Sequence, residues 1–436
     1  MQRIKTCLYL SIGFLLIPLN LYAQTSGKID SGDTAFLLIS AALVMLMTPG
    51  LAIFYGGMVR RKNVLGTLMQ SFFAIAVISI QWILYGYSLA FGPDVHGIIG
   101  DLSWMGLNGV GVDPNPDYAP TVPHIAFMIY QAMFSVITPA LITGAFAERM
   151  KFSAFLVFTI LWSTIVYDPV AHWIWGTGGW LRNMGALDFA GGMVVHITSG
   201  ISALAAALLI GKRKGHAHDF TPHNLPLTVL GAGLLWFGWF GFNAGSALSS
   251  GALSAMTFAV THISAVGATV IWVVIEWLHR GKPTMFGAAT GSIAGLATIT
   301  PASGFVGPMS ALIIGLCAGS ICYMALNMKN RLGYDDSLDA FGVHGVGGII
   351  GTLATGLLAQ KLINPAGADG LFFSSTAGMR FFTTQLTAVG VTMVYSFVVT
   401  IVLLKVLDKV MGLRLDDESE SLGLDIAEHG ETGYTL

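Results

Sequence analysis

Residues 33–58 read DTAFLLISAALVMLMTPGLAIFYGGM, an apolar run with no charged residue after Asp33, and the basic triplet 60–62 follows directly. A helix that crosses the hydrocarbon core of a membrane needs about 20 apolar residues. This stretch therefore predicts a membrane-spanning helix. Basic residues directly behind a span favour the cytoplasmic side, so we expect its C-terminal end to face the cytoplasm.

The same pattern repeats along the chain. Hydrophobic residues make up 54% of the sequence and charged residues only 10%, whereas soluble domains carry about 25% charged residues. So much apolar surface has to be covered by lipid. We expect an all-α integral membrane protein with eleven transmembrane helices, the first at 33–58 and the others at 66–91, 123–147, 152–175, 190–211, 226–248, 255–279, 284–301, 306–327, 339–359 and 384–410.

The distribution of Lys and Arg predicts the orientation of these spans. If the mature N-terminus lies outside the cytoplasm, fifteen of the 21 basic residues fall in cytoplasmic loops, and only Lys28, Arg182, Lys361 and Arg380 fall in outer segments. This bias follows the positive-inside rule. Eleven spans then leave the C-terminus in the cytoplasm. The net charge of −2 gives no indication of a nucleic-acid partner.

The two ends of the chain have separate interpretations. Residues 1–23 combine a basic start with a short apolar run and end at a small residue, which is typical of a cleaved signal peptide; an uncleaved span is the alternative. Cleavage leaves residues 24–411 as the membrane domain, and a bacterial inner membrane is the location that fits. Residues 412–436 are acidic and too polar for lipid. We expect a cytoplasmic regulatory tail there, and a dispensable solvated tail is the alternative.

Two His residues lie inside predicted spans, His196 in GGMVVHI and His344 in FGVHGVGG. Titratable groups inside a membrane are costly and point to function, although a lone buried His is usually satisfied by a neighbouring polar group. Spans one to five and six to ten would form an inverted five-helix pseudo-repeat, with the site between the halves. An acid precedes each His, Asp188 and Asp339, at different spacings. A facing imidazole pair could share a proton within an apolar tube.

Four aromatic residues lie near predicted helix ends or midpoints that are rich in Gly and Ser: Phe134, Trp175, Trp239 and Phe242. A cation over an aromatic face gains roughly 0.5–2 kcal/mol. The alternative is an aromatic belt at the membrane interface. The sequence has no P-loop and no HExxH motif, which argues against ATP-driven transport and against an intramembrane metalloprotease.

Several longer motifs resemble the ammonium transporter family (Amt/Mep/Rh), in particular its bacterial Amt type. They occur in order from roughly Asp33 to Tyr434, so the resemblance covers nearly the whole chain. The motifs are GALDFAGG followed by VVH at 185–196, WFGFNAGS at 239–246, TPA at 300–302, DAFGVHG at 339–345, and the tail elements GLD at 423–425 and EHGE at 428–431.

The resemblance implies a homotrimer with one central pore per subunit, transport rather than an enzymatic reaction, and no cofactor. It implies that ammonium is recruited at an aromatic outer site, deprotonated, and passed as ammonia along a hydrophobic pore with twin His residues. It also implies a PII-type regulatory protein as partner of the tail. By matching position, the ammonium site is Phe134, Trp175 and Ser246; the pore gate is Phe134, Phe242, Trp239 and Tyr130; the twin His residues are His196 and His344; and Asp188 supports the site.

This sequence departs from the family pattern at a few positions. Tyr130 stands where some relatives have Phe, and the segment from Trp175 to Asp188 looks one residue longer than in close relatives. Asp168 is an additional acid in span four to which the resemblance assigns no role.

Two other functions remain open from the sequence. One is a sodium-coupled transporter of an organic solute, for which Thr48-Pro49-Gly50 could form the required helix break. Uptake measured without sodium would separate it from ammonium transport. The other is a membrane ammonium sensor, in which the same site reports occupancy.

Overall fold

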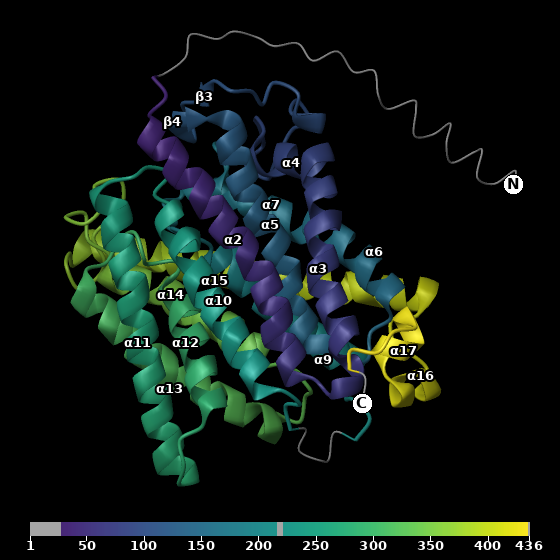
Figure 1. Cartoon of the computed structure of the whole chain (residues 1–436). Helices are drawn as coiled ribbons and strands as arrows, with labels where there is room; N and C mark the ends of the chain where they lie inside the picture. Colours follow the sequence, from purple (N-terminus) through teal and green to yellow (C-terminus); the bar gives the residue numbers. More distant parts are fainter. Residues whose placement is uncertain (1–27, 216–220, 435–436) are drawn as a thin grey trace, which may run out of the picture.

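The computed structural model describes residues 28–215 and 221–434, so the expected signal peptide at 1–23 lies outside the described residues. Figure 1 shows a bundle of long helices. Short strands lie at one end of the bundle, which we call the loop end. The C-terminal helices α16 and α17 lie at the other, which we call the tail end.

Ten helical segments within the described ranges are long and apolar enough to cross a membrane. Several consist of consecutive pieces joined by a π-helical turn. The expected all-α membrane architecture is therefore confirmed. In chain order the pieces are α2 (Ser31–Met58); α3 (Val64–Gln81), η2 (Trp82–Gly86) and α4 (Tyr87–Phe91); α5 (His124–Phe146); α6 (Phe152–Trp162), η4 (Ser163–Tyr167), α7 (Asp168–Trp175) and the short α8 (Trp180–Asn183); η5 (Gly192–Ile197) and α9 (Thr198–Ile210); α10 (Leu225–Gly245); α11 (Ala252–Arg280); α13 (Pro308–Leu332); η6 (Phe341–Gly345) and α14 (Val346–Leu358); and α15 (Thr376–Met411).

The eighth expected span, 284–301, corresponds to α12 (Met285–Ile299), which has only 15 residues. A membrane-spanning helix needs about 20. Every residue of α12 from Ala289 onward is buried, so this helix packs inside the protein. The count of eleven spans therefore stays a prediction.

Two small antiparallel hairpins cap the loop end. β1 (Asp94–Val95) pairs with β2 (Ile99–Gly100), and β3 (Pro114–Asn115) pairs with β4 (Ala119–Pro123). The strand β4 runs directly into α5. Asp117 and Tyr118, between β3 and β4, line the cavity described below.

Close packing of α10 against α2 depends on glycine. A Cβ atom at Gly231 would lie 2.3 Å from the backbone nitrogen of Phe54, and one at Gly241 would lie 2.7 Å from the backbone oxygen of Ser40. Real Cβ atoms do not approach that closely, so a larger residue would push the two helices apart. Small residues serve the same purpose at many membrane helix contacts.

The tail is folded against the tail end of the bundle in two short helices, α16 (Asp417–Leu422) and α17 (Leu424–His429). The carboxylate of Asp425 accepts a hydrogen bond from the backbone N–H of Gly66 at 2.9 Å. Likewise, Glu428 accepts from the backbone N–H of Phe152 at 2.8 Å. Both contacts reach the start of a membrane helix, where N–H groups lack partners within the helix.

Candidate functional site

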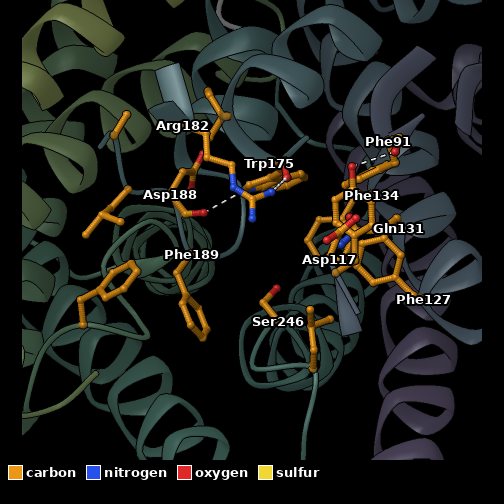
Figure 2. Close-up of a pocket in the computed structure, with 16 residues that line it drawn as sticks. Phe91, Asp117, Phe127, Gln131, Phe134, Trp175, Arg182, Asp188, Phe189 and Ser246 are labelled. Carbon is orange, nitrogen blue, oxygen red and sulfur yellow. Dashed lines mark hydrogen bonds between the residues drawn. The ribbon is translucent and has the colours of Figure 1, made fainter. Parts of the chain in front are cut away.

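A cavity of about 260 Å³ lies at the loop end, between α5, α7, the segment that precedes η5 and the C-terminal end of α10 (Figure 2). Its wall combines aromatic rings with a few polar side chains, a composition suited to a small partly hydrated ligand. The lining residues include Phe91, Asp117, Tyr118, Phe127, Gln131, Phe134, Trp175, Arg182, Asp188, Phe189 and Ser246.

Trp175 forms one wall of this cavity, at the C-terminal end of α7. Its indole Nε1 donates a hydrogen bond to the backbone oxygen of Asp188 at 2.8 Å. The ring lies edge-on to Phe134, with centroids 5.9 Å apart at 90°. The hydrogen bond therefore holds the indole in one orientation at the cavity wall.

Ser246 brings a hydroxyl to the same cavity at the end of α10. Its Oγ donates to the backbone oxygen of Phe242 at 2.9 Å and lies 3.1 Å from the Tyr130 hydroxyl. With its hydrogen committed to the carbonyl, the Ser246 oxygen has a lone pair to offer a ligand.

Tyr130 is placed differently from the expected gate residue. It is fully buried and is not among the residues that line the three cavities described here. Its hydroxyl contacts the backbone oxygens of Gly241 and Phe242 at 3.0 and 2.9 Å, and its ring packs on Phe134. Tyr130 therefore supports Phe134 from behind.

The rings of Phe134 and Phe242 close the bottom of the loop-end cavity. Their centroids are 4.3 Å apart, and each residue is 1% exposed. A second, much smaller cavity of about 10 Å³ lies behind Phe242, and a third of the same size follows toward the tail end. A volume of about 10–15 Å³ holds a single water. The three cavities thus form a series that is closed in this structure.

His196 and His344 lie between the second and third cavities. Both line the second cavity, and His344 also lines the third. Their Nδ1 atoms are 3.3 Å apart and the rings are nearly parallel, at 18°. Trp239 also lines the second cavity, stacks on His196 at 5.5 Å, and donates from Nε1 to Thr300 Oγ1 at 3.0 Å.

The close approach of two ring nitrogens defines what the pair can do chemically. A hydrogen bond between them requires a hydrogen on one Nδ1, so that neutral ring has a bare Nε2 while its partner carries a hydrogen on Nε2. The pair therefore offers one acceptor and one donor in surroundings that are otherwise apolar. His196 Nε2 has no partner within the described part of the chain, which leaves it available.

Asp188 supports the start of the segment that carries His196. The first N–H groups of a helix have no partner within the helix. The carboxylate of Asp188 satisfies them and so caps η5. Its Oδ1 accepts from Gly191 N at 2.8 Å and Gly192 N at 2.6 Å, and its Oδ2 accepts from Met193 N at 2.7 Å and Val194 N at 3.1 Å.

The sequence profile described as "Ammonium Transporter Family" matches residues 35–434. The chain belongs to the ammonium transporter family. A protein named ammonium transporter in Bacillus subtilis is 52% identical over 404 residues, covering 92% of this chain and 98% of the relative. Ammonium transporter Amt1 of Archaeoglobus fulgidus is 48% identical, covering 93% and 100%. Ammonium transport across a membrane is thus the activity that the family supports.

Solved structures of this family have the same architecture. The crystal structure of Saccharomyces cerevisiae Mep2 matches with a TM-score of 0.82 at 36% identity, covering 90% of this chain and 89% of that chain. A structure titled "Sensor Amt Protein" matches with a TM-score of 0.83 at 30% identity, covering 91% and 98%.

In this ammonium transporter the second His has a capping acid that the sequence analysis missed. Asp336 lies eight residues before His344, the same spacing that separates Asp188 from His196. Its carboxylate accepts two backbone hydrogen bonds at the start of η6, at 3.1 and 2.8 Å. The shared eight-residue spacing was the signal that could have found it.

The expectation that Asp339 corresponds to Asp188 is therefore corrected. Asp339 occupies the turn before η6 with a φ of 63°, and Gly191 occupies the turn before η5 with a φ of 113°. Each lies three residues after its capping acid. The two halves of this ammonium transporter thus share a local motif: a capping acid, a left-handed turn, and a π-helical segment that carries a His. π-helical turns are rare and are often found at functional sites.

A group of ion pairs lies at the tail end of the ammonium transporter. Arg213 contacts both Glu148, at 3.3 Å, and Asp335, at 2.9 Å. Burial alone would raise the pKa of Glu148, but the guanidinium groups of Arg213 and Arg60 outweigh it and hold the pKa below its usual value. No cluster of His, Cys, Asp and Glu among the described residues is arranged to hold a metal ion.

Proposed function

We propose that this ammonium transporter binds ammonium in the loop-end cavity and passes ammonia through the two smaller cavities beside the His pair. The observation that carries the proposal is the facing pair His196–His344, with Nδ1 atoms 3.3 Å apart behind two touching Phe rings. Relatives named ammonium transporters, at about half identity over nearly full length, support the substrate.

Recruitment uses groups that replace part of the hydration shell of ammonium. Trp175 and Phe134 present aromatic rings, and cation–π contact is worth roughly 0.5–2 kcal/mol. The free lone pair of Ser246 accepts one N–H of the ion. Metal cations such as potassium gain less from this site because they have no N–H to donate to Ser246.

The Phe134–Phe242 contact separates the species that can pass from those that cannot. A bare ion in an apolar cavity that holds a single water loses most of its hydration energy. Potassium cannot reduce its charge. Ammonium can, because it gives a proton to water in the loop-end cavity and continues as neutral ammonia once the rings rotate apart.

The His pair gives ammonia hydrogen-bond partners in a path that would otherwise be wholly apolar. The bare Nε2 of one ring accepts an N–H of ammonia, and the Nε2–H of the other donates to its lone pair. Beyond His344, the third cavity leads ammonia past Asp339 toward the tail end.

We also propose the orientation and assembly implied by the sequence. The loop end faces the periplasm and the tail end faces the cytoplasm of a bacterial inner membrane, because most basic residues lie at the tail end. Residues 1–23 are a cleaved signal peptide, residues 24–411 form the transporter, and residues 412–436 form a regulatory tail. The chain assembles as a homotrimer with one pore per subunit and binds a PII-type protein at its cytoplasmic face.

The sodium-coupled alternative receives less support. Its helix break was expected at Thr48-Pro49-Gly50. However, α2 continues from Ser31 to Met58 with Pro49 inside it. No broken helix is formed at this position to hold a sodium ion.

The test of the proposed function is replacement of His344 by Ala in proteoliposomes. We expect methylammonium uptake to be lost or potassium to pass, because the cavity loses its donor and acceptor, while the protein stays folded. His262→Ala is the matched control, since that exposed His lies in the span α11 beside Trp236 and lines none of the three cavities. Wild-type uptake and selectivity in a folded His344→Ala protein would overturn the proposal.

A further inference from the structure

Asp168 is a carboxyl group inside a membrane span that the transport pathway does not use. It lies midway along the segment Phe152–Asn183 and is 0% exposed. Within the described part of the chain, the carboxyl accepts one hydrogen bond, from Gln81 Nε2 to Oδ2 at 2.7 Å. Among the described residues no Lys, Arg or His forms an ion pair with it. An ionised carboxylate with a single donor is strongly disfavoured at such a place.

The surroundings of Asp168 are built to receive the Gln81 side chain. Gln81 is the last residue of α3, and η2 begins directly after it; η4 ends directly before Asp168. The carboxamide of Gln81 lies over Gly86, where a Cβ atom would come within 2.5 Å of Oε1 and 2.7 Å of Nε2. Only glycine leaves this space open. The absence of a side chain at Gly86 thus makes room for the Gln81 carboxamide, which forms the hydrogen bond between the second and fourth spans.

Two buried oxygens of this pair have no hydrogen-bond partner within residues 28–215 and 221–434, Oδ1 of Asp168 and Oε1 of Gln81. One is the second oxygen of the acid, and the other is the oxygen of the amide that already donates to it. A single hydrogen on Oδ1, donated to Oε1, would satisfy both at once. Acid and amide would then share two parallel hydrogen bonds, and no charge would remain in the membrane.

We propose that Asp168 holds a bound proton, and that the neutral acid–amide pair Asp168–Gln81 joins the second and fourth spans. Asp188 is the contrasting case, because its two oxygens accept four backbone N–H groups and so favour the ionised form. Two acids in neighbouring parts of one ammonium transporter thus take opposite charge states, set by their hydrogen-bond partners.

Other titratable groups around the pair have partners of their own or are neutral phenols. His172, one turn beyond Asp168, contacts the backbone oxygen of Ala90 at 3.0 Å and Asp94 at 2.9 Å. Tyr395 of α15 donates to the backbone oxygen of Ile165 at 2.6 Å. The remaining neighbours that titrate are Tyr85 of η2, 3.2 Å from the Thr164 hydroxyl, and Tyr167, which precedes Asp168.

The acid–amide pair Asp168–Gln81 has a consequence for the proposed ammonium site in the loop-end cavity. α7 is tied to the second span at two levels, by Asp168–Gln81 at its start and by His172 one turn later. The same helix ends at Trp175. A proton on Asp168 therefore helps to hold the helix that presents Trp175 to the loop-end cavity. Its loss would place an unpaired charge between the spans and loosen α7.

Infrared spectroscopy of the full protein in lipid tests the proton directly. The C=O stretch of a protonated carboxyl should be present at neutral pH, should shift in D₂O, and should be lost in Asp168→Asn. Asp408→Asn is the control, because Asp408 is exposed at the tail end and should contribute no such band. If the Asp168→Asn difference spectrum shows only carboxylate bands, the proposal is overturned. This result is independent of the proposed transport mechanism.

A second measurement uses Asn as a neutral copy of the protonated acid. Asp168→Asn should keep methylammonium uptake because its amide can still pair with Gln81, whereas Asp168→Leu and Gln81→Leu should reduce uptake. Wild-type uptake should fall relative to Asp168→Asn as pH rises, because only the wild type can lose the proton. Loss of uptake in folded Asp168→Asn protein would show that a neutral pair with Gln81 is not enough, and pH profiles that stay parallel up to high pH would show that uptake does not depend on the proton; either result would count against the proposal.

Discussion

Arg182 places a positive charge in the cavity that would receive a positively charged substrate (Figure 2). Its guanidinium donates to the backbone oxygen of Trp175 at 2.6 Å and contacts Thr177 Oγ1 at 3.3 Å. The group is held beside the proposed ammonium site although it is exposed. Two unit charges 4 Å apart repel by about 1 kcal/mol in water. Arg182 should therefore weaken ammonium binding and set the working concentration of the transporter.

We expect Arg182→Gln to lower the half-saturation concentration for methylammonium by roughly two- to fivefold. The effect should shrink as salt is added, because exposed charges are screened. Arg380→Gln, which removes an exposed cation from the start of α15, is the control and should change little. An unchanged or higher half-saturation concentration in Arg182→Gln would contradict this role.

Trp175 should contribute through its ring face rather than through its size alone. Replacing it by Leu removes the cation–π contact, so discrimination between ammonium and methylammonium should fall by roughly two- to thirtyfold. Trp175→Phe, which keeps a ring, should retain part of the discrimination. Competition of ammonium against labelled methylammonium uptake measures it. Equal inhibition constants in wild type and Trp175→Leu would argue against a cation–π contribution.

Among the elements, the π-helical segments η5 and η6 are what the sequence could not predict. Hydropathy located the spans that contain them, because a π turn leaves the apolar composition of a span unchanged. Hydropathy could not predict the π turn itself, because the turn changes the backbone geometry and not the composition. The recurrence of His196 and His344 was visible in sequence. Their 3.3 Å contact was not, because it depends on how two helices distant in sequence pack together.

Other differences between expectation and structure have similar causes. The apolar run at 284–301 predicted a span, and the structure forms the short buried helix α12 there, so hydropathy located the helix but not its burial between neighbouring helices. Asp336 was missed because the acidic run DDSLD at 335–339 offers several acids near the expected helix start. The docking of the tail near basic loops followed from charge. Its bonds to backbone N–H groups, such as that of Gly66, require the folded chain.

The cap of η6 makes a pH-dependent prediction at the scale of the element. Burial raises the pKa of Asp336 to about 6; the charge of Lys329 opposes this and that of Asp339 adds to it. Between about pH 4 and 6 the Asp336 carboxyl is therefore protonated in the folded protein, whereas in the unfolded chain it has lost its proton. The free energy of unfolding should fall by at most about 3 kcal/mol as pH rises through this window, and then level off.

Thermal unfolding in detergent between pH 4 and 7 checks this for wild type and Asp336→Asn. The variant lacks the Asp336 carboxyl, so its free energy of unfolding should fall less steeply across this window, by the contribution of Asp336. Asp335 does not confound the comparison: burial alone would raise its pKa, but hydrogen bonds and charge from Arg213 outweigh this and hold the pKa well below its usual value. Parallel curves for the two proteins would mean that Asp336 keeps an ordinary pKa.

At the scale of the whole molecule, the tail end joins parts of the chain that are distant in sequence. Arg213 links Glu148 of the first half to Asp335 of the second. Glu420 of α16 pairs with Arg414 at 2.8 Å and accepts from the backbone N–H of Lys214 at 2.8 Å. A shift of α16 would therefore be felt at the loop between α9 and α10. The tail is placed to transmit a change at its surface to the helices around the proposed pore.

This arrangement predicts that the tail regulates transport rather than the fold. Truncation after Leu415 removes Glu420 and Asp425 together with their contacts, but leaves every membrane span intact. We expect the truncated protein to insert and to assemble as a trimer, with altered methylammonium uptake and no capture of a PII-type protein. Glu431→Gln, which changes an exposed tail acid, is the control.

Point variants separate docking of the tail from its mere presence. Asp425→Leu removes the acceptor for the Gly66 N–H and should reproduce the change in uptake, because α17 then loses its hold on α3. Asp425→Asn keeps a side-chain oxygen acceptor and should resemble the wild type more closely. The remaining tail contacts include ion pairs, so raising salt should bring wild-type uptake toward that of the truncated protein. If truncated protein transports and captures the partner like wild type, the tail has no regulatory role and its contacts only anchor the chain.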